Sequence, residues 1–322
     1  AISLFGEADV DLGSHHWPAW GNDNVVSFLE NQRDTYKYLH DQSVRLINAG
    51  YNGAEIAEQL KMPEALDQSF ANRGYYGTVS HNAKAVYQMY MGWYDGNPAK
   101  LNPLPDEQAS ARYVQAMGGE SKVLELAQSA FDDGDYRWAA ELLNRLVFAG
   151  EDGSETRELL ASCYDQMGYQ AESGPWRNVY LSAAWELRNG TLEEGVDISV
   201  MSDVLANTSV DKFFDSMAVR LDGEKARGKE LNVEFYFTDL GERYRLEIRN
   251  SVLRHYKVEE EGDADAALVL SRGMFNRLTL GQVGLSDALF SDELSFQGSK
   301  LTLLEFFGLF DNPTGTFAIV TP

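Results

Sequence analysis

The chain has 322 residues, of which 44% are hydrophobic, and a formal net charge of −23. This length suggests two or three domains, and the apolar content is ample for packed cores. The acidic balance argues against nucleic acid as a partner, because binding to phosphates needs clustered Lys and Arg. It also disfavours adsorption to anionic membranes. No apolar run approaches the roughly 20 residues of a membrane-spanning helix, so we expect no stable membrane insertion.

The first 22 residues read as a strand and a loop at the end of an α/β layer. They include neither an initiator Met nor a signal peptide, so we expect the chain to begin inside a larger protein. His15 and His16 follow the short apolar strand, and α/β metallohydrolases place metal ligands in such loops. Adjacent histidines point in different directions, so usually one of them binds a given metal. From the residues alone, two surface histidines are the simpler interpretation.

Three helices are predicted next. Apolar residues recur at helical spacing over 25–47, and a shorter helix is predicted over 54–60, ahead of Pro63. The third is predicted over 80–91, and the turn signal DGNP at 95–98 follows it.

The segment 72–103, NRGYYGTVSHNAKAVYQMYMGWYDGNPAKLNP, concentrates polar groups around the start of the third helix. Arg73 is able to bind a tetrahedral oxyanion bidentately, as arginines bind phosphate. His81 lies near the helix N-terminus, which favours anions. Uncharged hydrogen-bonding groups complete this candidate site: Tyr75, Tyr76, Asn82 and Tyr94. A capped helix beside a polar loop explains the same residues without a site, so the residues alone leave both interpretations open.

Residues 106–190 are helical in pattern and contain a weak internal repeat. Gly134 and Gly168 each begin a similar short motif, and their spacing of 34 (168 − 134) is the period of a tetratricopeptide repeat. Two such units bury little surface by themselves, so they need a further helix layer or a second subunit. Cys163 lies in the apolar pattern LLASCYDQMG, which favours a buried residue over a reactive thiol.

Beyond a polar link at 191–200, the pattern is that of a compact α+β domain of about 120 residues. SVDKFFDSMAVRLDGEKA is an amphipathic helix. Period-2 alternation predicts strands in LNVEFYFTD, ERYRLEIRNSVLRHYKV and AALVLSRGMFNRLTLG. Helical patterns return in GLSDALF and KLTLLEFFGLF. Core packing explains most of the Phe and Met residues here, and a groove left among them would suit an alkyl chain.

Two segments, SHHWPAWG at 14–21 and the segment 72–103, resemble the alkyl sulfatases built on a metallo-β-lactamase-type domain. These zinc enzymes hydrolyse dodecyl sulfate and similar surfactants. The resemblance implies a mixed fold in three parts. They are the C-terminal part of an α/β metallo-β-lactamase-like catalytic domain (1–105), an all-α tetratricopeptide-like dimerisation domain (106–190) and an α+β sterol-carrier-protein-2-like domain (191–322).

The sequence departs from this family at its paired metal motif, HxHxDH, which the 322 residues do not contain. The five histidines are His15, His16, His40, His81 and His255, and no two have HxH spacing. The resemblance therefore implies that most of a two-zinc site lies upstream. His15 aligns with the last histidine ligand, which gives at most one zinc ligand here, and the choice between His15 and His16 stays open.

The resemblance predicts hydrolysis of alkyl sulfate esters to alcohol and sulfate, with Arg73 as the sulfate clamp and His81 as a donor. Substrate contacts are expected from Arg73, Tyr75, Tyr76, Asn82 and Tyr94. It also implies a homodimer through 106–190 and a periplasmic or secreted location. We expect the chain alone to be inactive.

Two alternatives remain. One is a hydrolase of the same fold that acts on another ester, such as a phosphate ester or a lactone. The other is a non-enzymatic adaptor that joins dimerising helices to a lipid-binding module, which the missing HxHxDH favours for the chain taken literally.

Overall fold

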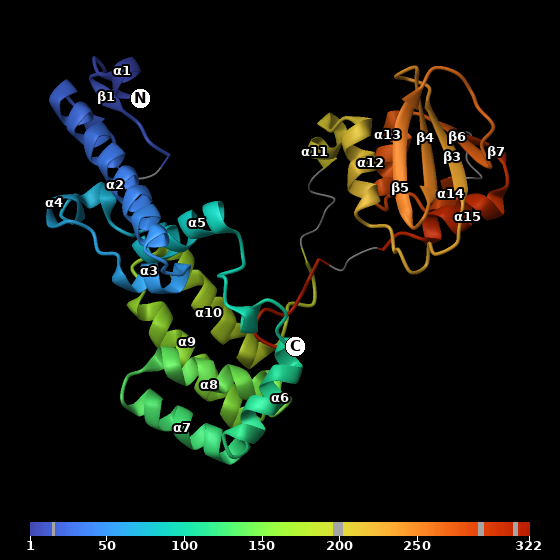
Figure 1. Cartoon of the computed structure of the whole chain (residues 1–322). Helices are drawn as coiled ribbons and strands as arrows, with labels where there is room; N and C mark the ends of the chain where they lie inside the picture. Colours follow the sequence, from blue (N-terminus) through green and yellow to red (C-terminus); the bar gives the residue numbers. More distant parts are fainter. Residues whose placement is uncertain (15–16, 196–201, 289–292, 312–314) are drawn as a thin grey trace. The chain divides into compact units, whose positions relative to one another are not determined.

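The computed structural model describes residues 1–14, 17–195, 202–288, 293–311 and 315–322. The chain separates into two compact units, Ala1–Thr191 with Ala318–Pro322, and Leu192–Phe317. Each unit has a hydrophobic core of its own. The predicted mixture of helices and sheet is confirmed (Figure 1), whereas the boundaries at 105 and 190 stay predictions. Among the described residues, no helix is long and apolar enough to cross a membrane.

The beginning of the first unit differs from the expected α/β layer. A short helix, α1 (Ile2–Phe5), precedes two antiparallel strands of two residues each, β1 (Val10–Asp11) and β2 (Ala19–Trp20). The strands pair only with each other among the described residues, and Val10 and Trp20 are exposed. An apolar strand forms a layer only when its side chains are covered, and these are not. His15 and His16 lie outside the described residues.

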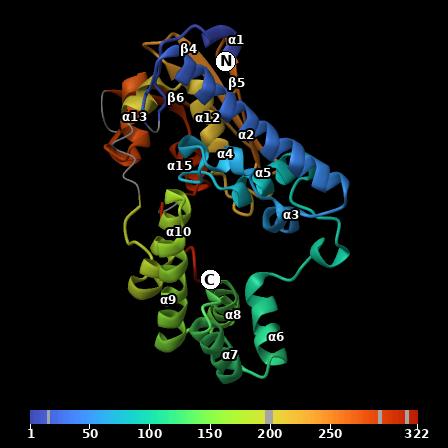
Figure 2. The same cartoon turned by 90° about the vertical axis from the view of Figure 1, so that its left-hand side faces the viewer.

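The three helices predicted next are confirmed, and Figure 2 shows them together with the shorter helix α4. In chain order the helices are α2 (Asn22–Asn48), α3 (Gly53–Gln59), α4 (Glu64–Asp67), the 3₁₀ turn η1 (Phe70–Asn72) and α5 (Val79–Met91). Asn52 caps α3 by accepting hydrogen bonds from the backbone of Ala54 and Glu55. Leu46, Ile56 and Tyr87 bury the faces on which α2, α3 and α5 meet.

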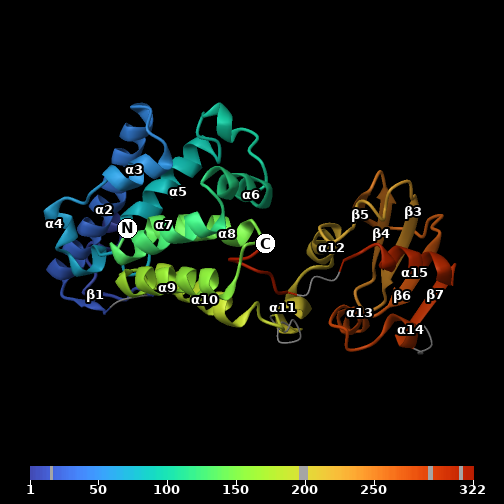
Figure 3. The same ribbon diagram turned by 90° about the horizontal axis from the view of Figure 1, so that it is seen from below.

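Five helices follow the 3₁₀ turn η2 (Pro98–Lys100), as the apolar spacing predicts. They are α6 (Asp106–Ala116), α7 (Glu120–Asp132), α8 (Tyr136–Phe148), α9 (Ser154–Gln170) and α10 (Gly174–Asn189). Figure 3 shows α7 to α10 side by side, and each packs on the next in sequence. Helices α7 and α9 begin 34 residues apart (154 − 120), which agrees with the period of a helix-pair repeat.

The two glycines that suggested this repeat are not equivalent, which corrects the sequence interpretation. Gly134 lies in the turn between α7 and α8 and has a φ of +81°, which favours glycine. Gly168 lies inside α9, where a Cβ would come 2.9 Å from the side chain of Leu181. One glycine provides a left-handed turn and the other a close helix–helix contact.

The second unit contains a five-stranded sheet in the order β5-β4-β3-β6-β7. Its strands are β3 (Leu231–Phe237), β4 (Glu242–Arg249), β5 (Val252–Val258), β6 (Ala266–Leu270) and β7 (Leu294–Gly298). Strands β3 and β6 pair in parallel, and the other neighbours are antiparallel. Its helices are α11 (Ser202–Asn207), α12 (Val210–Ala218), α13 (Arg272–Thr279), α14 (Leu285–Ala288) and α15 (Lys300–Gly308).

Alternation along the strands buries one face of this sheet beneath helices. Phe235 of β3 packs with Phe214 of α12 and Phe275 of α13 in a single apolar core, which also includes Phe306 of α15. The strand predicted over AALVLSRGMFNRLTLG is only half right. It stops at Leu270, because Ser271 accepts a hydrogen bond from the backbone N–H of Met274 and begins α13 instead.

Candidate functional site

The candidate site is built around the start of α5. Thr78 caps this helix, because its hydroxyl accepts a hydrogen bond of 2.9 Å from the backbone N–H of His81. The loop before the cap lies close against the helix, since a Cβ on Gly77 would stand 3.1 Å from the Asn82 side-chain oxygen. This close approach fixes how the loop enters α5.

The turn between α9 and α10 binds the same loop, although about a hundred residues separate the two segments. The hydroxyl of Ser173 donates a hydrogen bond of 2.6 Å to the backbone carbonyl of Tyr76, and the backbone N–H of Gly174 donates one of 2.8 Å to that of Tyr75. Ser173 is 1% exposed, so its hydroxyl is shielded from water. The helical region therefore holds the loop in place.

Arg73 also contacts this turn. Its guanidinium lies 2.6 Å from the carboxylate of Glu172, and 5.8 Å from the centre of the Tyr75 ring. Both charged side chains are about half exposed. A guanidinium has five N–H donors, so one contact with Glu172 leaves others that are able to bind an anion.

His81 is joined to α10 by a side-chain hydrogen bond. The indole Nε1–H of Trp176 donates to Nδ1 of His81 over 3.3 Å. The ammonium of Lys84, one turn further along α5, lies 5.9 Å from the centre of the Trp176 ring. Imidazole and indole are thus held together where α5 meets α10.

The structure gathers most, but not all, of the predicted site residues. Tyr75 and Tyr76 belong to the loop held by α10, and Tyr76 is 69% exposed. Asn82 follows His81 on α5. Tyr94 lies beyond the end of α5 with its ring tilted against that of Trp93, and no hydrogen bond or ion pair within the described ranges joins it to Arg73 or His81.

Three residues at this site are absent from the sequence prediction: Glu172, Ser173 and Trp176. The sequence contains a helix-start signal here, a Ser cap followed by Pro175 at the second helical position. That signal predicts the beginning of α10. It contains no information that this beginning faces a loop a hundred residues earlier.

Within the described residues of the first unit, no group of three side chains is placed to hold a metal ion. The two-zinc site implied by the resemblance is therefore not assembled from these residues alone.

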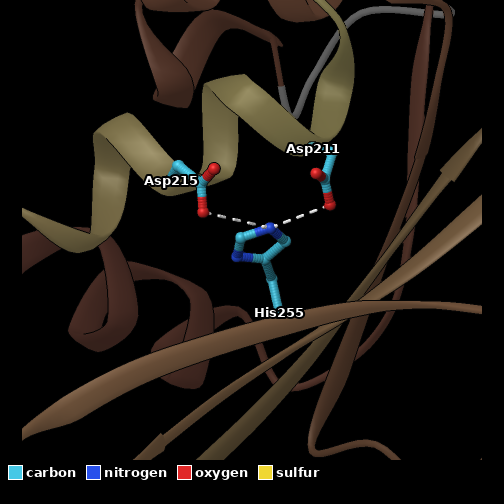
Figure 4. Close-up of side chains that lie close together, drawn as sticks. All are labelled: Asp211, Asp215 and His255. Carbon is cyan, nitrogen blue, oxygen red and sulfur yellow. Dashed lines mark hydrogen bonds and ion pairs between the residues drawn. The ribbon is translucent and has the colours of Figure 1, made fainter.

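A three-residue cluster occurs in the second unit instead, where Asp211, Asp215 and His255 bring ligand atoms within 4.8 Å of one another. Figure 4 shows the two carboxylates on α12 pointing at the imidazole on β5. Nε2 of His255 lies 3.1 Å from the Asp211 carboxylate and 3.7 Å from that of Asp215. Both carboxylates are more than half exposed, and a hydrogen bond between His255 on β5 and Asp211 on α12 accounts for the cluster.

Each unit also contains a hollow. A largely apolar cavity of about 280 Å³ lies in the second unit. Half of its lining residues are phenylalanines, among them Phe275, the others include Met217 and Leu268, and Arg220 and Thr279 are its polar members. A wider groove of about 680 Å³ lies among the helices of the first unit. Aromatic and charged residues line it, among them Tyr113, Arg137, Trp138, Tyr164 and Tyr180.

Comparisons with known proteins agree along the whole chain. Residues 52–190 match the family model for alkyl sulfatase dimerisation, and residues 199–322 match the model for the alkyl sulfatase C-terminal domain. A linear primary-alkylsulfatase of Pseudomonas sp. is 43% identical over 323 residues, which cover 100% of this chain and 48% of the relative. The alkyl/aryl-sulfatase BDS1 of Saccharomyces cerevisiae is 41% identical, and the match covers 100% of this chain and 49% of the relative.

A solved structure agrees with these matches. That of the stereoselective inverting sec-alkylsulfatase Pisa1 from Pseudomonas sp. has a TM-score of 0.93 and 39% sequence identity, over 100% of this chain and 51% of its own. The chain thus spans about half the length of the relatives that it matches. With its dimerisation and C-terminal domains both matched, the chain belongs to the alkyl sulfatase family.

Proposed function

We propose that this chain is the C-terminal portion of an alkyl sulfatase, which hydrolyses alkyl sulfate esters such as dodecyl sulfate to the alcohol and sulfate. The similarity to primary-alkyl, secondary-alkyl and alkyl/aryl sulfatases supports this reaction class. The chain's own contribution is a cationic, hydrogen-bonding site for the sulfate group at the start of α5.

One observation carries this proposal. Arg73 and His81 both contact the short stretch 172–176, Arg73 through Glu172 and His81 through Trp176. Two groups suited to a sulfate are therefore fixed to one rigid support rather than left on a free loop. A chain with a net charge of −23 repels an anionic ester at long range, so binding needs local donors of this kind.

Each predicted residue has a role in this proposal. Arg73 binds the sulfate with the guanidinium N–H groups that Glu172 does not occupy. His81 faces the oxygen on which charge develops, at a helix N-terminus that favours anions. Hydroxyl and amide groups supply uncharged hydrogen bonds: Tyr75, Tyr76, Asn82 and Tyr94.

We place the metal site mainly outside this chain. A two-zinc centre would supply the activated water that attacks the ester. His15 is the proposed contribution from this chain, as one ligand, with His16 as the alternative. Everything else that a two-zinc site needs belongs to the upstream part of the protein.

We propose a homodimer through 106–190. The match to the alkyl sulfatase dimerisation model supports this, and the groove beside Trp138 supplies a concave, partly apolar surface. Trp138 and Tyr113, which line it, are each about half exposed. Exposed aromatic side chains of this kind are enriched at protein interfaces.

The test compares the chain alone with the full-length protein on dodecyl sulfate, with sulfate release measured at equal protein concentration. We expect zinc-dependent turnover from the full-length protein and none from the chain. If the full-length protein hydrolysed phosphate esters or lactones but no alkyl sulfate, the related hydrolase would replace this proposal. A full-length protein that hydrolyses no ester would favour the adaptor.

A second proposed role, alkyl-chain binding, is favoured by the cavity of the second unit. Its volume of about 280 Å³ is near the lower end of the range for ligand pockets, and its aromatic lining suits a hydrocarbon. Titration of the chain with dodecanol tests it. Phe275→Ala should weaken binding, while Val219→Ala, at an exposed position, should not.

A further inference from the structure

Trp176 determines which nitrogen of His81 is able to carry a proton. An indole N–H donates hydrogen bonds and accepts none, so Nδ1 of His81 must be the acceptor in the 3.3 Å contact. In a neutral imidazole, one nitrogen accepts and the other carries the hydrogen. The proton of His81 therefore lies on Nε2 whenever this contact is made.

The contact is geometrically compatible only with an imidazole that carries no hydrogen on Nδ1. An imidazolium carries hydrogens on both nitrogens, and its Nδ1–H would face the Nε1–H of Trp176. Two donors would then stand against each other, and the hydrogen bond would be lost. When the contact is made, the ring therefore has a single donor, at Nε2.

Trp176 is not free to turn away from this contact. It is the third residue of α10, and its backbone N–H donates to the capping hydroxyl of Ser173. Its ring packs edge-on against Tyr180, with centroids 6.4 Å apart, and Lys84 lies over it. The indole is therefore fixed by its own helix and by α5 together.

We propose that Trp176 is a positioning residue that holds His81 in the tautomer with its hydrogen on Nε2. His81 then acts on the sulfate as a hydrogen-bond donor rather than as an acid that gives up its proton. The inference rests on the proposed sulfatase function. It departs from the usual role of a catalytic histidine, which is to transfer a proton.

The chemistry of the leaving group agrees with this role. When water attacks the carbon of R–O–SO₃⁻, the C–O bond breaks and its electron pair stays on oxygen. The products are R–OH, SO₄²⁻ and one proton, which comes from the attacking water. Sulfate is the conjugate base of a strong acid, so it departs without being protonated. A neutral N–H is sufficient to stabilise the charge that develops on it, as neutral imidazoles do elsewhere.

A first experiment reads the tautomer directly and needs no activity. Long-range ¹H–¹⁵N spectra of the ¹⁵N-labelled chain, above the pH at which free histidine is charged, distinguish Nδ1–H from Nε2–H. We expect Nε2–H in the wild-type chain, and an admixture of Nδ1–H in Trp176→Phe, which keeps a ring but lacks the donor. Trp185→Phe, at an exposed position on the same helix, is the matched control. Nδ1–H in the wild type, or identical signals in Trp176→Phe, would overturn the assignment.

A second experiment uses the full-length enzyme and two substitutions of His81. The amide N–H of His81→Gln lies near the place of Nε2 and donates without titrating, whereas His81→Ala has no donor. We expect His81→Ala to lower kcat by about 10²–10³-fold, and His81→Gln to recover at least about tenfold of that loss with KM little changed. Equal losses would show that proton transfer is required, and the inference would fail while the sulfatase function stood. If the wild-type enzyme released no sulfate, the proposed function would fail, and the tautomer spectra would still decide how Trp176 acts on His81.

Discussion

The carboxylate of Glu186 accepts a hydrogen bond of 3.1 Å from the backbone N–H of Val320, 134 residues later in the chain. The same oxygen accepts one of 2.9 Å from the N–H of Ile319. Glu186 is 8% exposed and Val320 is 6% exposed, and Val320 packs in the core of helices α6–α10. The last residues of the chain thus complete the first unit.

Glu186→Ala should destabilise the first unit by about 1–3 kcal/mol, because it leaves two buried backbone donors without an acceptor. Glu186→Gln keeps an acceptor oxygen and should cost less. Urea unfolding followed by the fluorescence of Trp138 and Trp176 measures both. Glu125→Ala, an exposed glutamate on α7, is the control. Equal stabilities of Glu186→Ala and the wild type would show that the tail is not held by this carboxylate.

Glu234 should be essential to the second unit. Its carboxylate is fully buried and binds Arg243, Arg245 and the backbone N–H of Gly262. Glu234→Ala removes the buried carboxylate from Arg245 and leaves Arg243 with Glu261 alone at 3.5 Å, so we expect a loss of about 3–5 kcal/mol in unfolding free energy. Differential scanning calorimetry of the chain should show a lowered second-unit transition.

The comparison for Glu234 is Glu224→Ala, which breaks an exposed ion pair with Arg227 and should cost less than about 1 kcal/mol. Similar losses in the two variants would contradict the special role of the buried carboxylate.

Alkaline pH should destabilise the first unit. Burial raises the pKa of the Cys163 thiol from an ordinary 9.0 to about 12, and that of the neighbouring Tyr164 from 10.0 to about 12. Above pH 9 the unfolded chain loses these protons while the folded chain keeps them. Their contribution to stability is therefore complete below pH 9 and is lost as the pH rises toward 12.

The pH dependence is measured by urea unfolding between pH 8 and pH 11. Cys163→Ala should remove the thiol's share of the slope, up to about 1.4 kcal/mol per pH unit. If the unfolding free energy of Cys163→Ala changed with pH as steeply as that of the wild type, the thiol would be excluded as a cause of the pH dependence. The same burial predicts that Cys163 reacts with a thiol reagent only after unfolding.

The dimer should depend on the groove of the first unit. Trp138→Glu replaces a large aromatic contact of this partly apolar surface with a charge, so it should shift the chain toward monomer in light scattering at micromolar concentration. Val219→Glu, at a position that is 85% exposed in the second unit, should leave the mass unchanged. A wild-type chain that stays monomeric, or a dimeric Trp138→Glu, would place the interface elsewhere.

Arg73→Lys should lower kcat of the full-length enzyme markedly, because the ammonium keeps the charge but loses the planar fork that matches a sulfate. Arg33→Lys, on an exposed face of α2, should have little effect. Near-normal turnover by Arg73→Lys would show that the loop before α5 has a structural role and does not bind the substrate.

Measuring zinc content distinguishes the proposed sulfate binding by Arg73 from metal binding by His15. His15→Ala should lose one metal equivalent, whereas Arg73→Lys should lose none. Unchanged zinc in His15→Ala would move the ligand to His16 or out of the chain.

The sequence by itself determined the local elements of this protein. Apolar spacing was sufficient for α2, α5 and the helices of 106–190, because a helix buries one face and that face recurs every three or four residues. Alternation was sufficient for β3 and for the stretch that forms β4 and β5, but it did not indicate the turn at Asn250 and Ser251 that divides this stretch into two strands. The alternating pattern continues beyond Leu270, but Ser271 caps a helix. Strand β6 therefore ends at Leu270 and α13 begins.

Only the tertiary structure decided which distant segments meet. Nothing in the pattern around Ser173 indicates that its hydroxyl binds the carbonyl of Tyr76, or that Trp176 faces His81. Val320 likewise reads as the end of the last domain, yet it packs among helices that precede that domain. Periodicity reports that a side chain is buried, because burial depends on local spacing. It does not report the partner, because the partner depends on how the whole chain folds back on itself.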